Sequence, residues 1–209
     1  FLATDAAVHV QVDHDISWAP GDLLHLAQVA LEKDAIVGGL YSMRGKGKGP
    51  AGRPLVARPE DGVSINLGTD SFVEAEYVSG GFTAIPRTVV EEVLKAGKDA
   101  AATLRQPNSN LTAERIRDLN NQALTECLYT DGTRFHPYYS CVVVPSKLSP
   151  GDFEFVSEDW SLSHRATAAN PKRKQWFWAR PFLGHHGKYA YTMVEAGQAV
   201  NSISRIVRP

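Results

Sequence analysis

The sequence predicts an α/β fold with a mixed sheet flanked by helices, and three consecutive segments carry this prediction. Residues 8–12 (VHVQV) alternate apolar and polar side chains, as in a strand with one face more buried than the other. A helical pattern follows up to Lys33, after a proline, Pro20, that suits a first helical position. Its apolar positions are Leu23, Leu24, Ala27, Ala30 and Leu31. Residues 35–41 (AIVGGLY) then form an apolar run suited to a buried strand. A strand, a helix and a strand at this spacing predict a crossover unit, and ligands gather at the carboxyl ends of strands in such sheets.

Further helices and strands are expected along the rest of the chain. Pro86 opens a predicted helix through Lys95 that Gly97 could cap. Residues 111–128, which begin with Leu111 and Thr112, have the pattern of an amphipathic surface helix. Another helix is expected after Ser157, whose side chain can cap it. Strands are expected near residues 63–67, 72–85, 134–144 and 175–192.

Composition places the chain among ordinary globular proteins. Its 209 residues, 43% of them apolar, fit one domain over 1–209 with a tail at 193–209. A net charge of −1 gives no electrostatic footprint for nucleic acid. No run approaches the ~18 apolar residues of a membrane span and no signal peptide is evident, so a cytoplasmic location is expected. The two cysteines, Cys127 and Cys141, are expected to be buried free thiols. The chain starts at Phe1 with a strand close behind, so an N-terminal part of the fold is expected to be missing.

Two aspartates, Asp13 and Asp15, follow the first strand and are the first candidate site. At period 2 they point to the same side, and two adjacent carboxylates repel each other unless a cation or a proton separates them. Such hard oxygen ligands suit Mg²⁺ or Mn²⁺. Taken alone, the pair is more simply an acidic turn before Pro20.

Three further motifs hold polar or glycine residues that could serve a site. Glu158 and Asp159 precede Trp160 at the predicted helix start, where a carboxylate either serves as a general base or complements the helix dipole. In LGHHGKY, His185 and His186 are either metal ligands or hydrogen-bonded structural residues. The glycines of SGGF, residues 79–82, either admit a ligand or permit a turn.

The order of these motifs resembles the GT-A glycosyltransferases, especially family-2-like enzymes of bacteria and their phages. It runs from the aspartate pair through VGGLY and SGGF to SEDW and to an ending with Trp178, Pro181, Leu183, Gly184, His185 and Gly187. The resemblance spans about residues 1–192. It implies a GT-A fold and a metal-dependent transfer of a sugar from a nucleotide-diphosphate donor to the hydroxyl of a glycan or other acceptor. In this family the aspartate pair follows nucleotide-binding units, whereas almost nothing precedes Asp13 in this sequence. Either an N-terminal half is missing here, as the start at Phe1 favours, or the chain is a remnant without a uridine or guanosine pocket.

Site roles follow from the resemblance by position. Asp13, Asp15 and His185 match the residues that hold Mn²⁺ or Mg²⁺. Asp159, with Glu158 as the alternative, matches the base that deprotonates the acceptor hydroxyl. Residues expected at the substrate are Tyr41, Gly80, Gly81, Phe82, Trp160 and His186.

Two other functions stay open, as does the role of a basic segment. A catalytically silent glycan-binding or assembly domain would keep the same shape. A metal-dependent nucleotide-sugar hydrolase would use the same acidic pair without an acceptor. The Gly- and Pro-rich segment 42–54, which contains Arg44, Lys46 and Lys48, is either a lid over the phosphates or a solvated loop.

Overall fold

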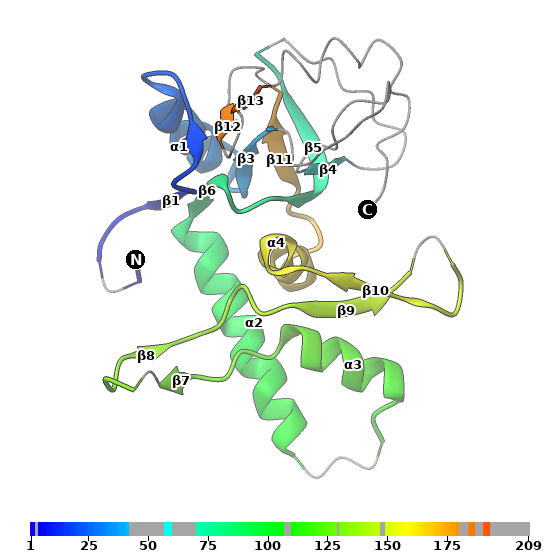
Figure 1. The fold of residues 1–209 in the computed structure, drawn as a ribbon. Coiled ribbons are helices and arrows are strands. Elements are labelled where there is room, and N and C mark those ends of the chain that lie inside the picture. Colours follow the sequence, from blue (N-terminus) through cyan, green and yellow to red (C-terminus); the bar gives the residue numbers. More distant parts are fainter. Residues whose placement is uncertain are drawn as a thin grey trace. The chain divides into compact units, whose positions relative to one another are not determined.

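A computed structural model describes residues 1–2, 4–41, 57–59, 70–106, 110–128, 130–146, 149–179, 184–186 and 190–192, with the backbone alone for 57–59, 184–186 and 190–192 (Figure 1). The chain divides into two compact units. The first combines Phe1–Arg87 with Lys174–Pro209, and the second is Thr88–Arg173. Expected features at 42–54 and 63–67, and residues Pro181, Leu183 and Gly187, lie outside the described residues.

A six-stranded mixed sheet forms the centre of the first unit, which confirms the α/β prediction. Its order is β1-β6-β3-β11-β5-β4. The strands are β1 (Val8–Val12), β3 (Val37–Gly39), β4 (Ala57–Pro59), β5 (Phe72–Val78), β6 (Phe82–Pro86) and β11 (Gln175–Trp178). β3 runs parallel to β11, whereas the other neighbouring strands are antiparallel.

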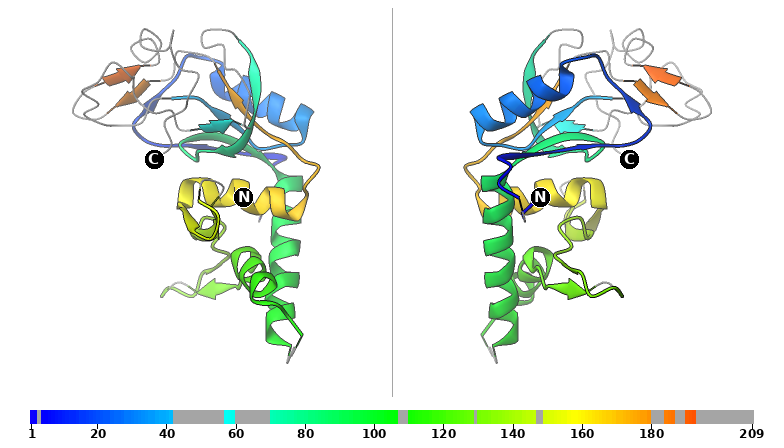
Figure 2. Two further views of the ribbon diagram at one scale, coloured as in Figure 1. Left: turned by 90° about the vertical axis from the view of Figure 1, so that its right-hand side faces the viewer. Right: turned by 90° about the vertical axis from the view of Figure 1, so that its left-hand side faces the viewer.

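The predicted crossover unit forms, with one strand inserted into it. β1 and β3 each pair antiparallel with β6, so they run in the same direction with β6 between them. Helix α1 (Asp22–Lys33) connects them and contacts all three strands, and Figure 2 shows it on one face of the sheet. The carboxyl ends of β1 and β3 and the amino end of β6 therefore lie at the same edge of this sheet.

Helix α1 differs from its prediction in its start and in its buried face. It begins at Asp22 and not at Pro20, because the Asp22 carboxylate accepts a hydrogen bond of 2.7 Å from the backbone N–H of Ala19 and closes a turn there. Leu24 is 78% exposed. Leu31 is also exposed. The predicted positions Leu23 and Ala30 do face the core, together with Leu26 and Val29, which were not predicted.

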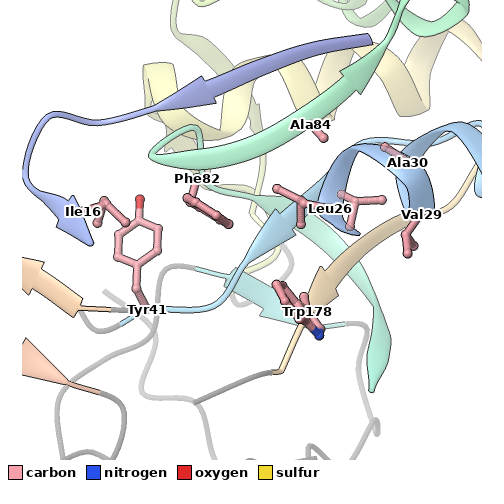
Figure 3. Close-up of a cluster of buried hydrophobic side chains, with 9 residues drawn as sticks. Ile16, Leu26, Val29, Ala30, Tyr41, Phe82, Ala84 and Trp178 are labelled. Carbon is pink, nitrogen blue, oxygen red and sulfur yellow. The ribbon is translucent and has the colours of Figure 1, made fainter. Parts of the chain in front are cut away.

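The core of the first unit lies between α1 and the sheet (Figure 3). Its buried members are Ile16, Leu26, Val29, Ala30, Val37, Tyr41, Phe82, Ala84 and Trp178. Tyr41 lies between Ile16 and Phe82, so the core extends to the sheet edge where β1 ends. Each large apolar side chain buried in this way contributes roughly 1.5–3 kcal/mol.

A second, three-stranded sheet also belongs to the first unit. Its order is β13-β12-β2, with β2 at Ile16–Ser17, β12 at Gly184–His186 and β13 at Ala190–Thr192. Together with β11, these strands confirm the β-rich pattern expected for residues 175–192. The β-like segment expected around 72–85 is confirmed as β5 and β6, which a turn at residues 79–81 separates.

The second unit contains three helices and two short hairpins among its described residues (Figure 1). The helices are α2 (Arg87–Arg105), α3 (Ala113–Gln122) and α4 (Glu158–Ala169). β7 (Cys127–Leu128) pairs with β8 (Arg134–Phe135), and β9 (Val142–Pro145) pairs with β10 (Phe153–Val156).

Two helix ends in this unit were wrongly predicted. Gly97 does not cap α2 but lies buried inside it, because the side chain of Leu124 packs against the glycine. α3 begins behind Thr112 as predicted, and the Thr112 side chain accepts from the N–H of Arg115 at 3.1 Å. It ends at Gln122, well before residue 128.

The two cysteines are free, as expected, but neither is buried. Cys127 is partly exposed and lies in β7, and Cys141 is exposed. Their burial was therefore wrongly predicted. None of the helices in the described ranges is both long enough and apolar enough to cross a membrane.

Candidate functional site

The aspartate pair lies in a turn at the carboxyl end of β1. The N–H of Asp13 donates to the carbonyl of Gly81 at 2.8 Å and so extends the β1–β6 ladder by one residue. The N–H of Ile16 then donates back to the carbonyl of Asp13 at 3.0 Å. Strand alternation does not extend through such a turn, so the period-2 argument for the pair does not apply. Asp13 is exposed and Asp15 is partly buried.

Gly80 and Gly81 form the turn that leads into β6, beside the aspartate turn. A Cβ atom on Gly81 would lie 2.0 Å from Oη of Tyr41 and 2.9 Å from Oδ2 of Asp13. Only a glycine therefore fits without displacing one of these side chains. The sequence left two explanations for the glycines of SGGF, namely ligand access and turn formation. The close approach of Tyr41 and Asp13 to Gly81 explains by packing alone why a glycine is required there.

A buried hydroxyl network supports this glycine turn. Oη of Tyr41 and Oγ of Ser79 are 2.8 Å apart in a buried hydrogen bond. The Thr83 hydroxyl donates to the carbonyl of Ser79. Ser79 and Thr83 were not among the predicted site residues. Their only sequence signal is a polar residue on either side of GGF, which does not reveal burial.

The second sheet brings the histidine motif to the aspartate turn. In the β2–β12 register, His185 is paired with Ile16 and Gly184 with Ser17. The backbone of His185 thus lies across from the residue that directly follows Asp15, although the two motifs are far apart in the sequence. The side chains of His185 and His186 lie outside the described part. Among the side chains that are described, no three His, Cys, Asp or Glu residues are grouped closely enough to hold a metal ion.

The SEDW motif begins α4 in the second unit. Glu158 and Asp159 occupy its first turn, as predicted, and both are exposed. Ser157 is the N-cap residue, but its side chain makes no capping hydrogen bond. The Ser161 hydroxyl instead donates to the carbonyl of Glu158 at 2.8 Å. Trp160 is partly buried. The first-turn position places both side chains at the positive end of the helix dipole.

A buried arginine, Arg165, joins α4 to the loop before β9. Sequence reasoning did not identify this residue. Arg165 is 3% exposed, and its guanidinium donates to the carbonyls of Tyr138 and Ser140 at 3.1 and 2.7 Å. Burial lowers the pKa of Arg165 and raises that of the Tyr138 phenol. Cys141 follows this loop, and its Sγ lies 4.0 Å from Oε2 of Glu158. Arg165 therefore fixes the chain that borders the SEDW motif.

Comparison with known proteins adds no relative. The chain matches no protein-family model, no curated protein and no solved structure.

Proposed function

We propose that this chain is a metal-dependent glycosyltransferase with a GT-A fold, which moves a sugar from a nucleotide-diphosphate donor to an acceptor hydroxyl. The ordered motifs of the sequence suggest this function. The mixed sheet with flanking helices is compatible with such a fold. The contacts at the aspartate turn supply the structural support.

The pairing of β2 with β12 is the observation that carries the proposal. A coincidental aspartate pair has no reason to lie beside a histidine motif from the other end of the chain. Here His185 is paired with Ile16 in the β2–β12 register, and Asp15 is the residue directly before β2. Pairing of this kind is expected if Asp13, Asp15 and His185 act together.

The residues at this turn fit a hard divalent cation. Two carboxylates and an imidazole form a donor set suited to Mn²⁺, and with fewer protein ligands to Mg²⁺. Asp13 is exposed, so a ligand can reach its carboxylate from solvent. A bound cation would stabilise the negative charge that develops on the departing diphosphate.

The acceptor needs a base, and we assign this role to Asp159, with Glu158 as the alternative. The acceptor oxygen bonds to the anomeric carbon while the bond from that carbon to the β-phosphate oxygen breaks. The acceptor proton passes to the carboxylate, and the nucleoside diphosphate leaves with the electron pair. General-base catalysis of this kind typically contributes about 10²–10⁴-fold.

Donor binding and turnover separate the roles of these residues. In wild type, Mn²⁺ with UDP, GDP, UDP-glucose or GDP-mannose should raise the thermal midpoint for at least one nucleotide, since a ligand that binds the folded state stabilises it. Asp159→Asn should keep that shift and lower sugar transfer by about 10²-fold or more. Glu158→Gln, a matched neighbour, should lower transfer much less.

Three results would count against the proposal. Absence of any midpoint shift in the nucleotide panel would contradict donor binding. Sugar release to water, with no transfer to any glycan acceptor, would favour the hydrolase. Loss of turnover in Glu158→Gln alone would move the base from Asp159 to Glu158.

A further inference from the structure

We infer that Trp18 is a sugar-binding residue, whose indole ring stacks on the sugar of the donor beside the aspartate turn. This inference rests on the proposed function and extends it to a residue with no assigned role. It concerns the first unit alone, so every contact used comes from that unit.

Trp18 exposes a large part of its indole ring to solvent, which is unusual for a tryptophan side chain. The residue is 42% exposed, although its ring centroid lies 6.1 Å from that of Phe82, which is completely buried. One part of the indole thus packs against the first residue of β6 while another part faces solvent. Tryptophan is highly buried on average, and exposed Trp side chains are enriched where ligands or partners bind.

The indole also has an unused hydrogen-bond donor within the described part of the chain. No described residue accepts from its N–H, and Phe82 is the one aromatic ring that it contacts there. By contrast, the buried Trp178 donates its indole N–H to Asp70 at 2.5 Å. Trp18 therefore offers a ring face and a free N–H together.

The surroundings of Trp18 indicate which part of the donor it would contact. It lies three residues after Asp15, within about 11 Å along an extended chain. Phe82, its packing partner, follows Gly81, where Tyr41 and Asp13 approach the backbone closely. If the diphosphate binds at the aspartates, the sugar bonded directly to its β-phosphate would lie within reach of Trp18.

The chemistry of a sugar ring matches both features of the indole. A pyranose has faces of C–H groups, which pack against aromatic rings by dispersion, and hydroxyl groups at its rim, which accept hydrogen bonds. A nucleobase also has a stacking face and hydrogen-bond acceptors, but the ribose separates it from the diphosphate, whereas the donor sugar is bonded directly to the β-phosphate. Because Trp18 follows Asp15 by only three residues, we assign Trp18 to the sugar and not to the base.

Calorimetric titration of the whole chain in Mn²⁺ tests this assignment. UDP and UDP-glucose, with GDP and GDP-mannose as the second pair, are titrated into wild type, Trp18→Ala, Trp18→Phe and Leu24→Ala. In wild type, one nucleotide sugar should bind more tightly than its nucleoside diphosphate. Trp18→Ala should lose about tenfold in affinity for that nucleotide sugar and leave the diphosphate affinity unchanged.

The other variants keep the test independent of folding. Trp18→Phe retains a ring without the N–H and should lose less affinity than Trp18→Ala. Leu24→Ala truncates another exposed apolar side chain of the same unit and should change neither affinity.

Each remaining outcome has a distinct meaning. If wild type binds neither nucleotide pair, the proposed function fails, and the role of Trp18 fails with it. If wild type binds and Trp18→Ala keeps the full advantage of the sugar, this inference alone is overturned. An equal loss for the diphosphate and its sugar would indicate base stacking, which also overturns it.

Discussion

At the scale of single residues, Gly81 is the position with the least room for change. Gly81→Ala would place a methyl group 2.0 Å from Oη of Tyr41, which is already bonded to Ser79 inside the protein. One of these groups must move, and breaking a buried hydrogen bond costs about 1–3 kcal/mol. We expect Gly81→Ala to lower the free energy of unfolding by roughly that amount, measured by urea denaturation.

A double-mutant cycle with Tyr41→Phe identifies the cause. Tyr41→Phe removes the oxygen nearest to the new methyl group, so the double variant should be more stable than the sum of the single changes predicts. Strict additivity would show that Gly81 is needed for its backbone freedom and not for this contact.

Some residues of the candidate site could be predicted from the sequence and others could not. The difference depends on whether neighbouring residues in the sequence reveal them. Asp13 and Asp15 could be found because a strand pattern ends at them. The surroundings of Gly81 could not, because Tyr41 and Asp13 reach it only through the β1–β6–β3 pairing. The position of His185 opposite Ile16 likewise depends on a strand pairing that no local pattern encodes.

At the scale of elements, helix α2 gives a prediction in which two effects of opposite sign compete. In an exposed helix, Gly97→Ala would stabilise the protein by about 1 kcal/mol through helix propensity. Here the new Cβ would lie 2.6 Å from Cγ of Leu124. Overpacking of a buried contact costs typically ~1–3 kcal/mol, so Gly97→Ala should destabilise the protein on balance.

Gly97→Ala made in a Leu124→Ala background is the control for the clash with Leu124. Leu124→Ala removes Cγ and Cδ1, two of the three atoms that the new methyl group would meet. Adding Gly97→Ala should then cost less than it does in wild type, as measured from urea midpoints. An unchanged cost in both backgrounds would exclude Leu124 as the source of the clash.

Helix starts were easier to predict than helix ends and faces. Thr112 caps α3 through an N–H three residues away, and α4 begins at Glu158 directly after its N-cap residue Ser157, so both starts follow from nearby residues. The end expected at Gly97 failed because Leu124, which occupies the space beside it, is distant in sequence. The face of α1 was predicted only in part: Ala30 is buried as expected, whereas Leu24 and Leu31 are exposed, because contact with β1, β6 and β3 decides which side of the helix is buried.

At the scale of the whole molecule, the net charge of the protein affects how it could bind the diphosphate of a nucleotide sugar. A net charge of −1 gives no general attraction for a nucleotide diphosphate. The aspartate turn would even repel it. Donor binding by this protein should therefore depend on a cation that the turn holds, and the protein should bind this cation before the nucleotide.

Mn²⁺ alone, without nucleotide, gives the corresponding prediction. At 100 times its dissociation constant, a cation that binds only the folded protein adds about 2.7 kcal/mol of stability, so the thermal midpoint of wild type should rise by several degrees. Asp15→Asn keeps the shape of the side chain and should lose most of this rise.

His185→Ala should lose part of the rise in thermal midpoint, because the register of β12 brings the backbone of His185 beside the aspartate turn. His186→Ala, at the next position of the same strand, is the matched control and should keep the rise. If His186→Ala alone loses the rise in thermal midpoint, His186 and not His185 is the metal ligand. If Asp15→Asn keeps the full rise, the aspartate turn does not bind the metal.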